Sequence, residues 1–532
     1  MKRRSFIKGS AAAAGGLMAA PYISKGEYLT NLLPNQAFGF DNDDNILIMI
    51  ELFGGNDGLN TIIPVNDPEY YNLRPTVAIP SVAAKQWGTT NLFMHPALVD
   101  HPEVENNGLM TLLDQGRLAV LEGVGYQNPN LSHFRSSDIW HSGIISSDPE
   151  VRLLEGWMGR FIASRLPNYP FEIPEHPIAI SVEGTIPLAL KSNKGHMAIS
   201  VNDPERFYQF GKGLTPIDNL MPGGSPYQDE YNFIHVIAQQ SESYSTAVKQ
   251  AYDNGENAVQ YGGGSISQKL QLISRLISGG LKTKVFYIGL SNFDSHVQQS
   301  EDDVYAGQHP DHLSNLAAGI STFMQDATEQ GFSERILGYT FSEFGRRAYD
   351  NGSRGTDHGA GSSMFIFGHN EFITGGLHGQ SPNLKDLDGG GNLRSRPEED
   401  FRRVYADILK YWFHASQNEI DSLFGEIVDP LEIISPRVGI ENEYLKGAKQ
   451  AGVKIYPNPS NGRGFIEFEL MQRANVDVRI YSLDGRLNVS LKQGLTNPGI
   501  YKVPFEINQI GAFTAVVIVN GRRYAENLTV VK

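Results

Sequence analysis

Short apolar runs alternate with amphipathic patterns along most of this chain. The runs span residues 46–52, 117–124, 285–290, 336–341 and 364–367. They are rich in aliphatic and aromatic residues, as buried parallel strands are. Apolar positions at three- and four-residue steps in 311–331 and 399–413 predict helices between and after them. This alternation predicts an α/β fold, a mostly parallel sheet with helices packed on both faces.

Residues able to bind a cation flank these runs. They are Asp57, Asp294, His296, Glu343, Asp357 and His358. The first four follow a run directly, and the last two precede the run at 364–367. Because the C-terminal ends of the strands line one crevice in an open α/β sheet, distant residues can converge there. Carboxylates mixed with imidazoles predict a site for divalent metal ions such as zinc, calcium, magnesium or manganese.

Composition narrows the classes of function. The chain has 532 residues and 40% hydrophobic content, enough for one large core and a second, smaller domain. Its formal charge of −15 argues against nucleic acid as a partner, because phosphate-backbone binding needs a basic face. With no cysteine, disulfides, thiolate ligands and a cysteine nucleophile are excluded.

The N-terminal residues predict export. A twin-arginine run, Arg3–Lys8, precedes the weakly apolar stretch Gly9–Ala20, so residues 1–25 are predicted to be a signal peptide read by the twin-arginine translocase. The alternative is a disordered basic N-terminus. No other apolar run approaches the roughly 20 residues of a transmembrane helix.

The composition of the chain changes near its C-terminal end. Residues 435–452 are polar and predict a linker, and residues 453–532 contain short alternating strands. Asp484-Gly485 and Asn520-Gly521 are typical hairpin turns between such strands. The sequence therefore predicts a small C-terminal all-β sandwich.

This last segment resembles the type A sorting domain of the type IX secretion system. The resemblance lies in Ile455–Pro459, Ile480–Arg486, Gly499–Tyr501 and the terminal strand, and it departs at Gly511–Phe513. It implies a protein that passes through the periplasm and type IX machinery to the cell surface or the medium. An ordinary carbohydrate-binding or stalk sandwich is the alternative.

The body, residues 45–434, resembles domain-of-unknown-function family 1501. The motifs are Leu52–Thr61, Tyr70–Pro75, Asn128–Phe134, Phe293–His296, Phe341–Arg347 and Gly355–Gly359. Such families are grouped with the alkaline phosphatase and sulfatase superfamily, so the resemblance implies an alkaline-phosphatase-like fold.

The superfamily's enzymes hold two metals and use a serine or threonine nucleophile, and the resemblance carries these roles over position by position. Asp57, Asp294, His296 and His358 match metal ligands. Ser132, at the start of a helix expected over Ser132–Ser142, matches the nucleophile, and Arg135 lies one turn on.

One position departs from the superfamily pattern. Glu343-Phe344 stands where an aspartate–histidine pair is expected, and Phe344 cannot bind a metal. Alternatively Asp357-His358 is that pair, and Glu343 supports a ligand from behind.

Structural roles compete with each functional assignment. Asp57 could be a turn former, Ser132 a plain N-cap, and Glu343 the partner of a neighbouring arginine. His133, His309, His312 and His378 have weaker claims to a metal.

Two functions follow. One is a secreted or surface-anchored metal-dependent hydrolase acting on phosphate, sulfate or related esters of an anionic small molecule or polysaccharide. The other is a catalytically inactive surface protein acting in binding, adhesion or nutrient capture.

Overall fold

The computed structural model describes residues 44–435 and 453–531, except 103, 170–172, 214–240, 395, 397–398, 471–473, 483–486, 498 and 520–521. The predicted signal peptide, residues 1–25, and nearly all of the predicted linker lie outside the described residues. The described chain forms two compact units, one on each side of that linker. No helix in these ranges is both long and apolar enough to span a membrane.

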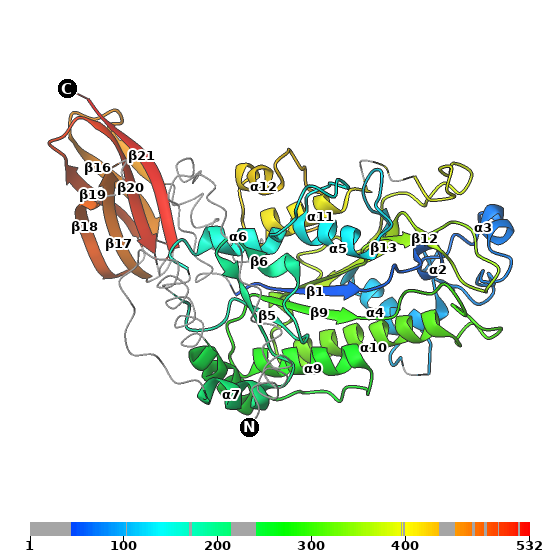
Figure 1. The fold of residues 1–532 in the computed structure, drawn as a ribbon. Coiled ribbons are helices and arrows are strands. Elements are labelled where there is room, and N and C mark those ends of the chain that lie inside the picture. Colours follow the sequence, from blue (N-terminus) through cyan, green and yellow to red (C-terminus); the bar gives the residue numbers. More distant parts are fainter. Residues whose placement is uncertain are drawn as a thin grey trace. The chain divides into compact units, whose positions relative to one another are not determined.

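A central sheet of eight strands organises the first unit, in the order β14-β4-β13-β10-β1-β9-β5-β8 (Figure 1). The strands are β1 Ile46–Leu52, β4 Leu118–Val124, β5 Ala179–Ser181, β8 Ala198–Ser200, β9 Val285–Leu290, β10 Ile336–Phe341, β13 Ser362–Gly368 and β14 Gly376–His378. All neighbours pair in parallel except β13, which is antiparallel to both β10 and β4. The predicted mostly parallel sheet is confirmed.

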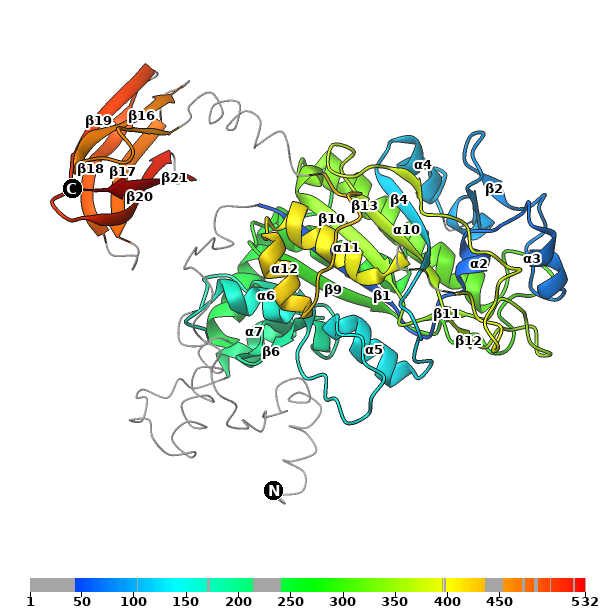
Figure 2. The same cartoon turned by 90° about the horizontal axis from the view of Figure 1, so that it is seen from above.

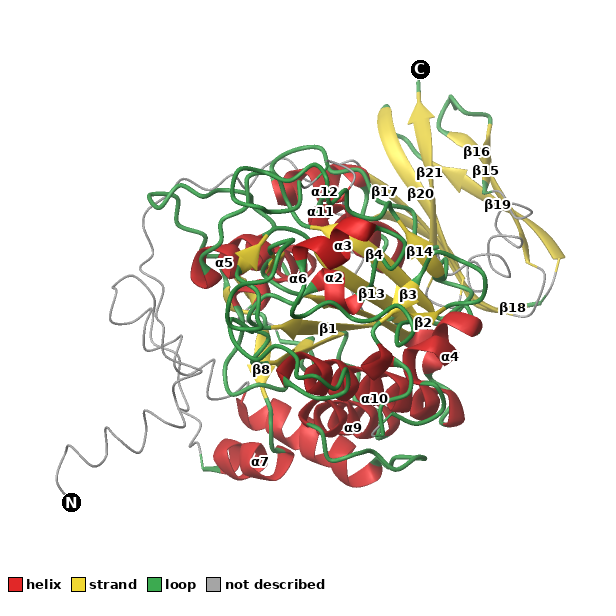
Figure 3. Ribbon diagram, turned by 90° about the vertical axis from the view of Figure 1, so that its right-hand side faces the viewer, coloured by secondary structure: helices red, strands yellow, loops and turns green. Residues whose placement is uncertain are grey.

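Helices cover both faces of this sheet (Figure 3). On one face lie α4 Gly108–Asp114, α9 Ser265–Ser278 and α10 Gln308–Glu329; on the other lie α5 His133–Ser142, α6 Trp157–Arg165, α11 Phe401–Asp407 and α12 Gln417–Phe424. Strand β1 is buried on both sides, so its alternate side chains enter two different cores. Ile46, Ile48 and Ile50 pack with α9 and α10.

The two helices expected from apolar periodicity are present with shifted ends. The helix expected after residue 311 is α10, which begins at Gln308. The helix expected over 399–413 is α11, which continues as a π-helical turn over Ile408–Trp412. The remaining short elements are α2 Gly58–Thr61, α3 Pro68–Leu73, α7 Pro204–Lys212, β2 Lys85–Gln86, β3 Phe93–Met94, β6 Lys191–Ser192, β7 Gly195–His196, β11 Gly345–Arg346, β12 His358–Gly359 and 3-10 helices at Pro96–Leu98, Leu188–Leu190 and Ser333–Arg335.

Loops from β1, β9 and β10 meet at the C-terminal edge of the sheet, where β11 and β12 also pair (Figures 1 and 2). The turn after β1 passes very close to the loop after β9. A Cβ on Gly54 would lie 2.2 Å from the backbone nitrogen of Asp294, and Gly54 has φ +119°. Only glycine fits this position, because both the contact and the backbone angle exclude a side chain.

The second unit is an antiparallel β-sandwich, as predicted. Its strands are β15 Lys454–Tyr456, β16 Arg463–Leu470, β17 Ala474–Ser482, β18 Leu487–Thr496, β19 Gly499–Glu506, β20 Gly511–Val519 and β21 Arg522–Val530. They form two sheets, β15-β16-β19 and β18-β17-β20-β21. Alternate residues of both sheets, such as Ile466, Phe468, Val478 and Ile480, share one core.

Candidate metal centre

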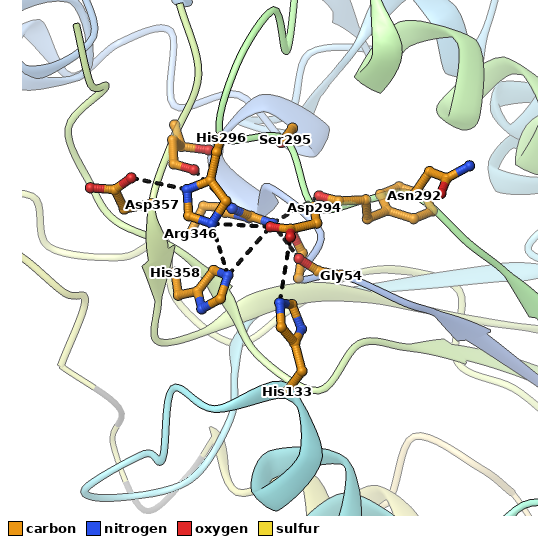
Figure 4. Close-up of polar contacts among 12 residues, drawn as sticks. Gly54, His133, Asn292, Asp294, Ser295, His296, Arg346, Asp357 and His358 are labelled. Carbon is orange, nitrogen blue, oxygen red and sulfur yellow. Dashed lines mark hydrogen bonds and ion pairs between the residues drawn. The ribbon is translucent and has the colours of Figure 1, made fainter. Parts of the chain in front are cut away.

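Four side chains gather at the C-terminal edge of the central sheet (Figure 4). Asp294 and His296 belong to the loop after β9, His358 belongs to β12, and His133 is the first residue of α5. The Nε2 atoms of His296 and His358 lie 3.2 and 3.3 Å from Asp294 Oδ1. His133 Nε2 lies 3.6 Å from Asp294 Oδ2. Three imidazoles thus present the same ring atom to one carboxylate.

The spacing of three of these atoms fits a single metal ion. His296 Nε2 and His358 Nε2 are 3.0 Å apart, so with Asp294 Oδ1 they form a nearly equilateral triangle. Ligands about 2.0–2.1 Å from a tetrahedral zinc ion lie about 3.3 Å from one another. His133, Asp294 and His358 form a second triple whose ligand atoms lie within 4.8 Å of one another.

Every imidazole of the group is held at its other nitrogen. The Nδ1 atom of His133 lies 2.7 Å from Glu343 Oε1, that of His296 lies 3.1 Å from Asp357 Oδ1, and that of His358 lies 2.9 Å from the Leu131 carbonyl oxygen. These oxygens only accept hydrogen bonds, so each Nδ1 carries the proton. In the neutral ring Nε2 then offers a lone pair. Metal-binding histidines are oriented in this way.

Two such lone pairs facing each other at 3.0 Å repel unless a cation or a proton lies between them. Burial holds the pKa of His358 below its ordinary value, which favours the neutral ring. The hydrogen bond that His133 donates to Glu343 raises the pKa of His133. The donor set therefore fits a divalent cation.

A buried arginine fixes the central carboxylate. Arg346 Nη2 lies 2.8 Å from Asp294 Oδ1. Burial alone would raise the pKa of Asp294, but the Arg346 guanidinium holds it below its ordinary value. Arg346 also donates to backbone carbonyls of Gly55 and Thr356 at 2.8 Å, and to those of Gly54 and Phe293. Asp294 therefore stays ionised beside the three imidazoles.

Glu343 and Asp357, both expected as metal ligands, lie behind histidines. Glu343 is buried and accepts from the Gly54 backbone nitrogen at 2.9 Å as well as from His133. Asp357 accepts from Asn351 Nδ2 at 3.2 Å and faces Arg347 Nη1 at 3.5 Å. These contacts match the alternative in which Glu343 supports a ligand from behind, and they give Asp357 the same position.

Asp57 pairs with an arginine, Arg74, that is not part of the four-residue group. Its Oδ2 atom is 2.6 Å from Arg74 Nη1, and both side chains are fully buried. Gln299 donates to the same oxygen. Desolvation raises the pKa of Asp57, but Arg74 overcomes this and leaves it lowered. Asp57 thus forms a buried ion pair through Oδ2, and its place beside a metal stays a prediction.

The two expected catalytic residues, Ser132 and Arg135, lie at the start of α5. Ser132 is the exposed N-cap of α5, and its hydroxyl makes no capping bond. Arg135 donates to the carbonyl oxygens of Ser146, Asp148 and Val151 at 2.7, 2.8 and 2.9 Å. These three bonds tie α5 to the following loop and leave the guanidinium little capacity for a substrate.

The residue that sequence reasoning underrated is His133. It lies in the Asn128–Phe134 motif, one position after Ser132, the expected nucleophile. Phe344, buried at 3% exposure, packs its ring 4.8 Å from the His133 ring and 4.5 Å from the His358 ring. Phe344, which cannot bind a metal, thus packs against two imidazoles that can.

Comparison with known proteins gives a family match over part of the chain. A family described as "Protein of unknown function (DUF1501)" matches residues 236–388. That segment includes Asp294, His296 and His358, and it begins well after His133. No curated protein matches the sequence.

Several solved structures are similar to the chain. One is a protein of the alkaline phosphatase superfamily from Vibrio parahaemolyticus, with 10% identity and a TM-score of 0.29, covering 100% of this chain and 92% of that one. Another is the PsFucS1 sulfatase from Pseudoalteromonas sp., with 11% identity and a TM-score of 0.31, covering 88% and 84%. A third is the phosphonate monoester hydrolase SpPMH from Silicibacter pomeroyi, with 11% identity and a TM-score of 0.27, covering 91% and 88%. None of these TM-scores reaches 0.5.

Proposed function

We propose that the protein is an exported metal-dependent hydrolase of phosphate, sulfate or related esters. Its divalent ion is held by His133, Asp294, His296 and His358. One observation carries this proposal: three imidazoles turn Nε2 toward one carboxylate while an acceptor oxygen holds each Nδ1. Such an arrangement leaves the lone pairs of three rings free for one cation.

One ion fits the donors better than two. Asp57 is engaged with Arg74, Glu343 holds His133, and Phe344 fills the space beside two of the imidazoles. When bound, a divalent ion acts as a Lewis acid on the ester and lowers the pKa of a water molecule. The chain's own contribution is to orient the imidazoles through Glu343 and Asp357 and to keep Asp294 charged through Arg346.

The nucleophile in this proposal is a water molecule. Among the described residues the Ser132 hydroxyl has no hydrogen-bond partner, and a serine nucleophile needs a base or a metal to activate it. Ser132 remains the second candidate because it directly precedes His133 in the chain. Replacing the serine distinguishes the two.

The same proposal includes where the enzyme is located in the cell. The twin-arginine segment would deliver it folded through the twin-arginine translocase, and the C-terminal sandwich would pass it to type IX machinery. At the cell surface or in the medium it would meet anionic small molecules and polysaccharide esters. The alternative, a catalytically inactive surface protein, draws support from Phe344, which stands where the superfamily pattern has a metal ligand.

Metal analysis and ester hydrolysis test the proposal together. The full chain, loaded with zinc or manganese and dialysed, is expected to retain one equivalent of metal and to hydrolyse 4-nitrophenyl esters of sulfate or phosphate. H358A and D294A should lose both properties. H378A is the matched control, because His378 bonds the Thr374 carbonyl away from the group.

Two outcomes contradict the proposal. Wild-type protein that retains no metal would exclude the metal centre. Protein that retains one equivalent yet hydrolyses none of these esters would favour the inactive surface protein.

A further inference from the structure

The charge around the metal centre selects among the esters just named. We propose that the site binds a singly charged ester that carries an apolar group, such as a sulfate monoester or a phosphate diester. It would discriminate against the doubly charged phosphate monoester. This inference depends on the proposed function, and it concerns only which substrates that site accepts.

The charges of the site nearly cancel. The carboxylates in direct contact with the three imidazoles are Asp294, Asp357 and Glu343. The arginines that contact these carboxylates are Arg346 and Arg347. Together with a divalent ion, these groups leave one net positive charge. A singly charged ester neutralises that charge, whereas a doubly charged ester leaves the complex negative.

The charge of the ester decides how tightly it binds, because the attraction by the site and the cost of desolvating the ester depend differently on that charge. The attraction of a positive site grows in proportion to the charge of the ligand. The cost of taking the ligand out of water grows with the square of that charge. A second negative charge on the ligand therefore strengthens binding only where a further cation contacts it.

No further cation is free to do so among the described residues that surround the site. Arg346 is 1% exposed and spends its donors on four carbonyls and Asp294. Arg135 donates to three carbonyls, and Arg74 is buried against Asp57. Arg347 is partly exposed, and its charge faces Asp357.

Two apolar side chains flank the residues that would hold the ion. Phe134 follows His133 and is 87% exposed, and Val297 follows His296 and is 56% exposed. The histidines that precede them, His133 and His296, both face Asp294 (Figure 4). An exposed aromatic ring gains free energy when an organic group covers it. These two residues would contact the organic part of the ester.

The charge preference can be measured without turnover. Phenylphosphonate carries two negative charges at pH 8. Its monomethyl ester has the same phenyl ring but carries only one negative charge. Titration calorimetry on the metal-loaded full chain should show the monomethyl ester binding about tenfold more tightly, equivalent to about 1.4 kcal/mol. Tighter binding of phenylphosphonate would overturn the inference.

Hydrolysis separates this inference from the function it depends on. The value of kcat/KM at pH 8 should be higher for 4-nitrophenyl sulfate or bis(4-nitrophenyl) phosphate than for 4-nitrophenyl phosphate, and the better of the two identifies the ester class. A preference for 4-nitrophenyl phosphate would refute the charge argument while leaving the hydrolase intact. If none of the three is hydrolysed, the hydrolase fails, and the calorimetric order still decides the charge preference.

The apolar contact has its own variant. F134A should weaken binding of the monomethyl ester of phenylphosphonate about tenfold, the expected effect of losing a covered aromatic ring. Binding of monomethyl methylphosphonate, which lacks the ring, should not change. I427A is the matched control. Ile427 is also a highly exposed apolar residue, at 77%, but it follows α12, which carries none of the four residues of the metal centre. An unchanged affinity in F134A would remove Phe134 from the substrate site.

Discussion

Asp357 offers the sharpest test of the metal centre, because it was expected as a ligand and instead lies behind one. Its Oδ1 atom accepts from His296 Nδ1 at 3.1 Å, which is the contact that orients this ring. Because the Asp357 side chain is 40% exposed, its charge adds little through space, and the hydrogen bond dominates. Removing such an outer partner typically lowers metal affinity about 10- to 100-fold.

We therefore expect graded losses of zinc affinity. D357N keeps an acceptor oxygen without the charge and should lose about tenfold, or about 1.4 kcal/mol. D357A also loses the hydrogen bond and should lose about a hundredfold, or about 2.7 kcal/mol. D294A removes a ligand and should abolish binding.

The assay is competition for zinc against a chelating indicator of known affinity. D386N is the control, because Asp386 pairs with Arg394 on the surface. The reasoning is refuted if D357A abolishes binding as D294A does, since Asp357 would then be a ligand. It is equally refuted if D357A binds zinc like the wild type, since the orientation of His296 would then not matter.

Three further variants test neighbouring assignments. S132A should keep ester hydrolysis within about fivefold if water is the nucleophile, whereas loss of about a hundredfold or more would assign that role to Ser132. D57N should still bind one metal but unfold about 3–5 kcal/mol more easily, because it leaves Arg74 buried without its charge partner; loss of the metal in a folded D57N would restore Asp57 as a ligand. Burial lowers the pKa of His309 to about 4, so protonation of this residue in the unfolded chain below pH ~6.5 should lower the free energy of unfolding of the wild type by about 3 kcal/mol at pH 4, in addition to the losses from other histidines. That loss should be absent in H309Q, measured by urea unfolding and tryptophan fluorescence; an equal loss in both proteins would contradict the assigned pKa.

Strand orientation explains how much of the site the sequence could predict. Asp294 and Glu343 directly follow strands β9 and β10, so the rule for parallel sheets correctly placed them at one edge. His358 precedes β13, where the same rule would place it at the opposite edge. It reaches the site because β13 runs antiparallel to β10 and β4. Apolar runs carry no signal for that reversal, so only the structure could supply it.

It is harder to predict from sequence which of two adjacent residues faces the metal centre than which strand ends meet there. Asp357 and His358 are adjacent, yet Asp357 contacts the Nδ1 edge of the His296 ring and His358 contacts its Nε2 edge. Adjacent residues of an extended segment point to opposite sides, so only one of the pair faces the ion directly. Ser132 and His133 differ likewise, because Ser132 is the N-cap with extended backbone, whereas His133 is the first residue of α5.

Burial finally separates a structural carboxylate from one that can serve a metal. Asp57 and Asp294 each follow a strand, so both were equally plausible ligands from sequence, and in the fold each contacts an arginine. The Asp57 side chain is fully buried against Arg74, and its charge is already compensated there. The Asp294 side chain is 45% exposed; Arg346 contacts its Oδ1 atom, but the three imidazoles that it faces supply no charge while they are neutral. A cation that binds Asp294 therefore gains an ionised carboxylate without breaking a buried pair, whereas one that binds Asp57 would have to displace Arg74.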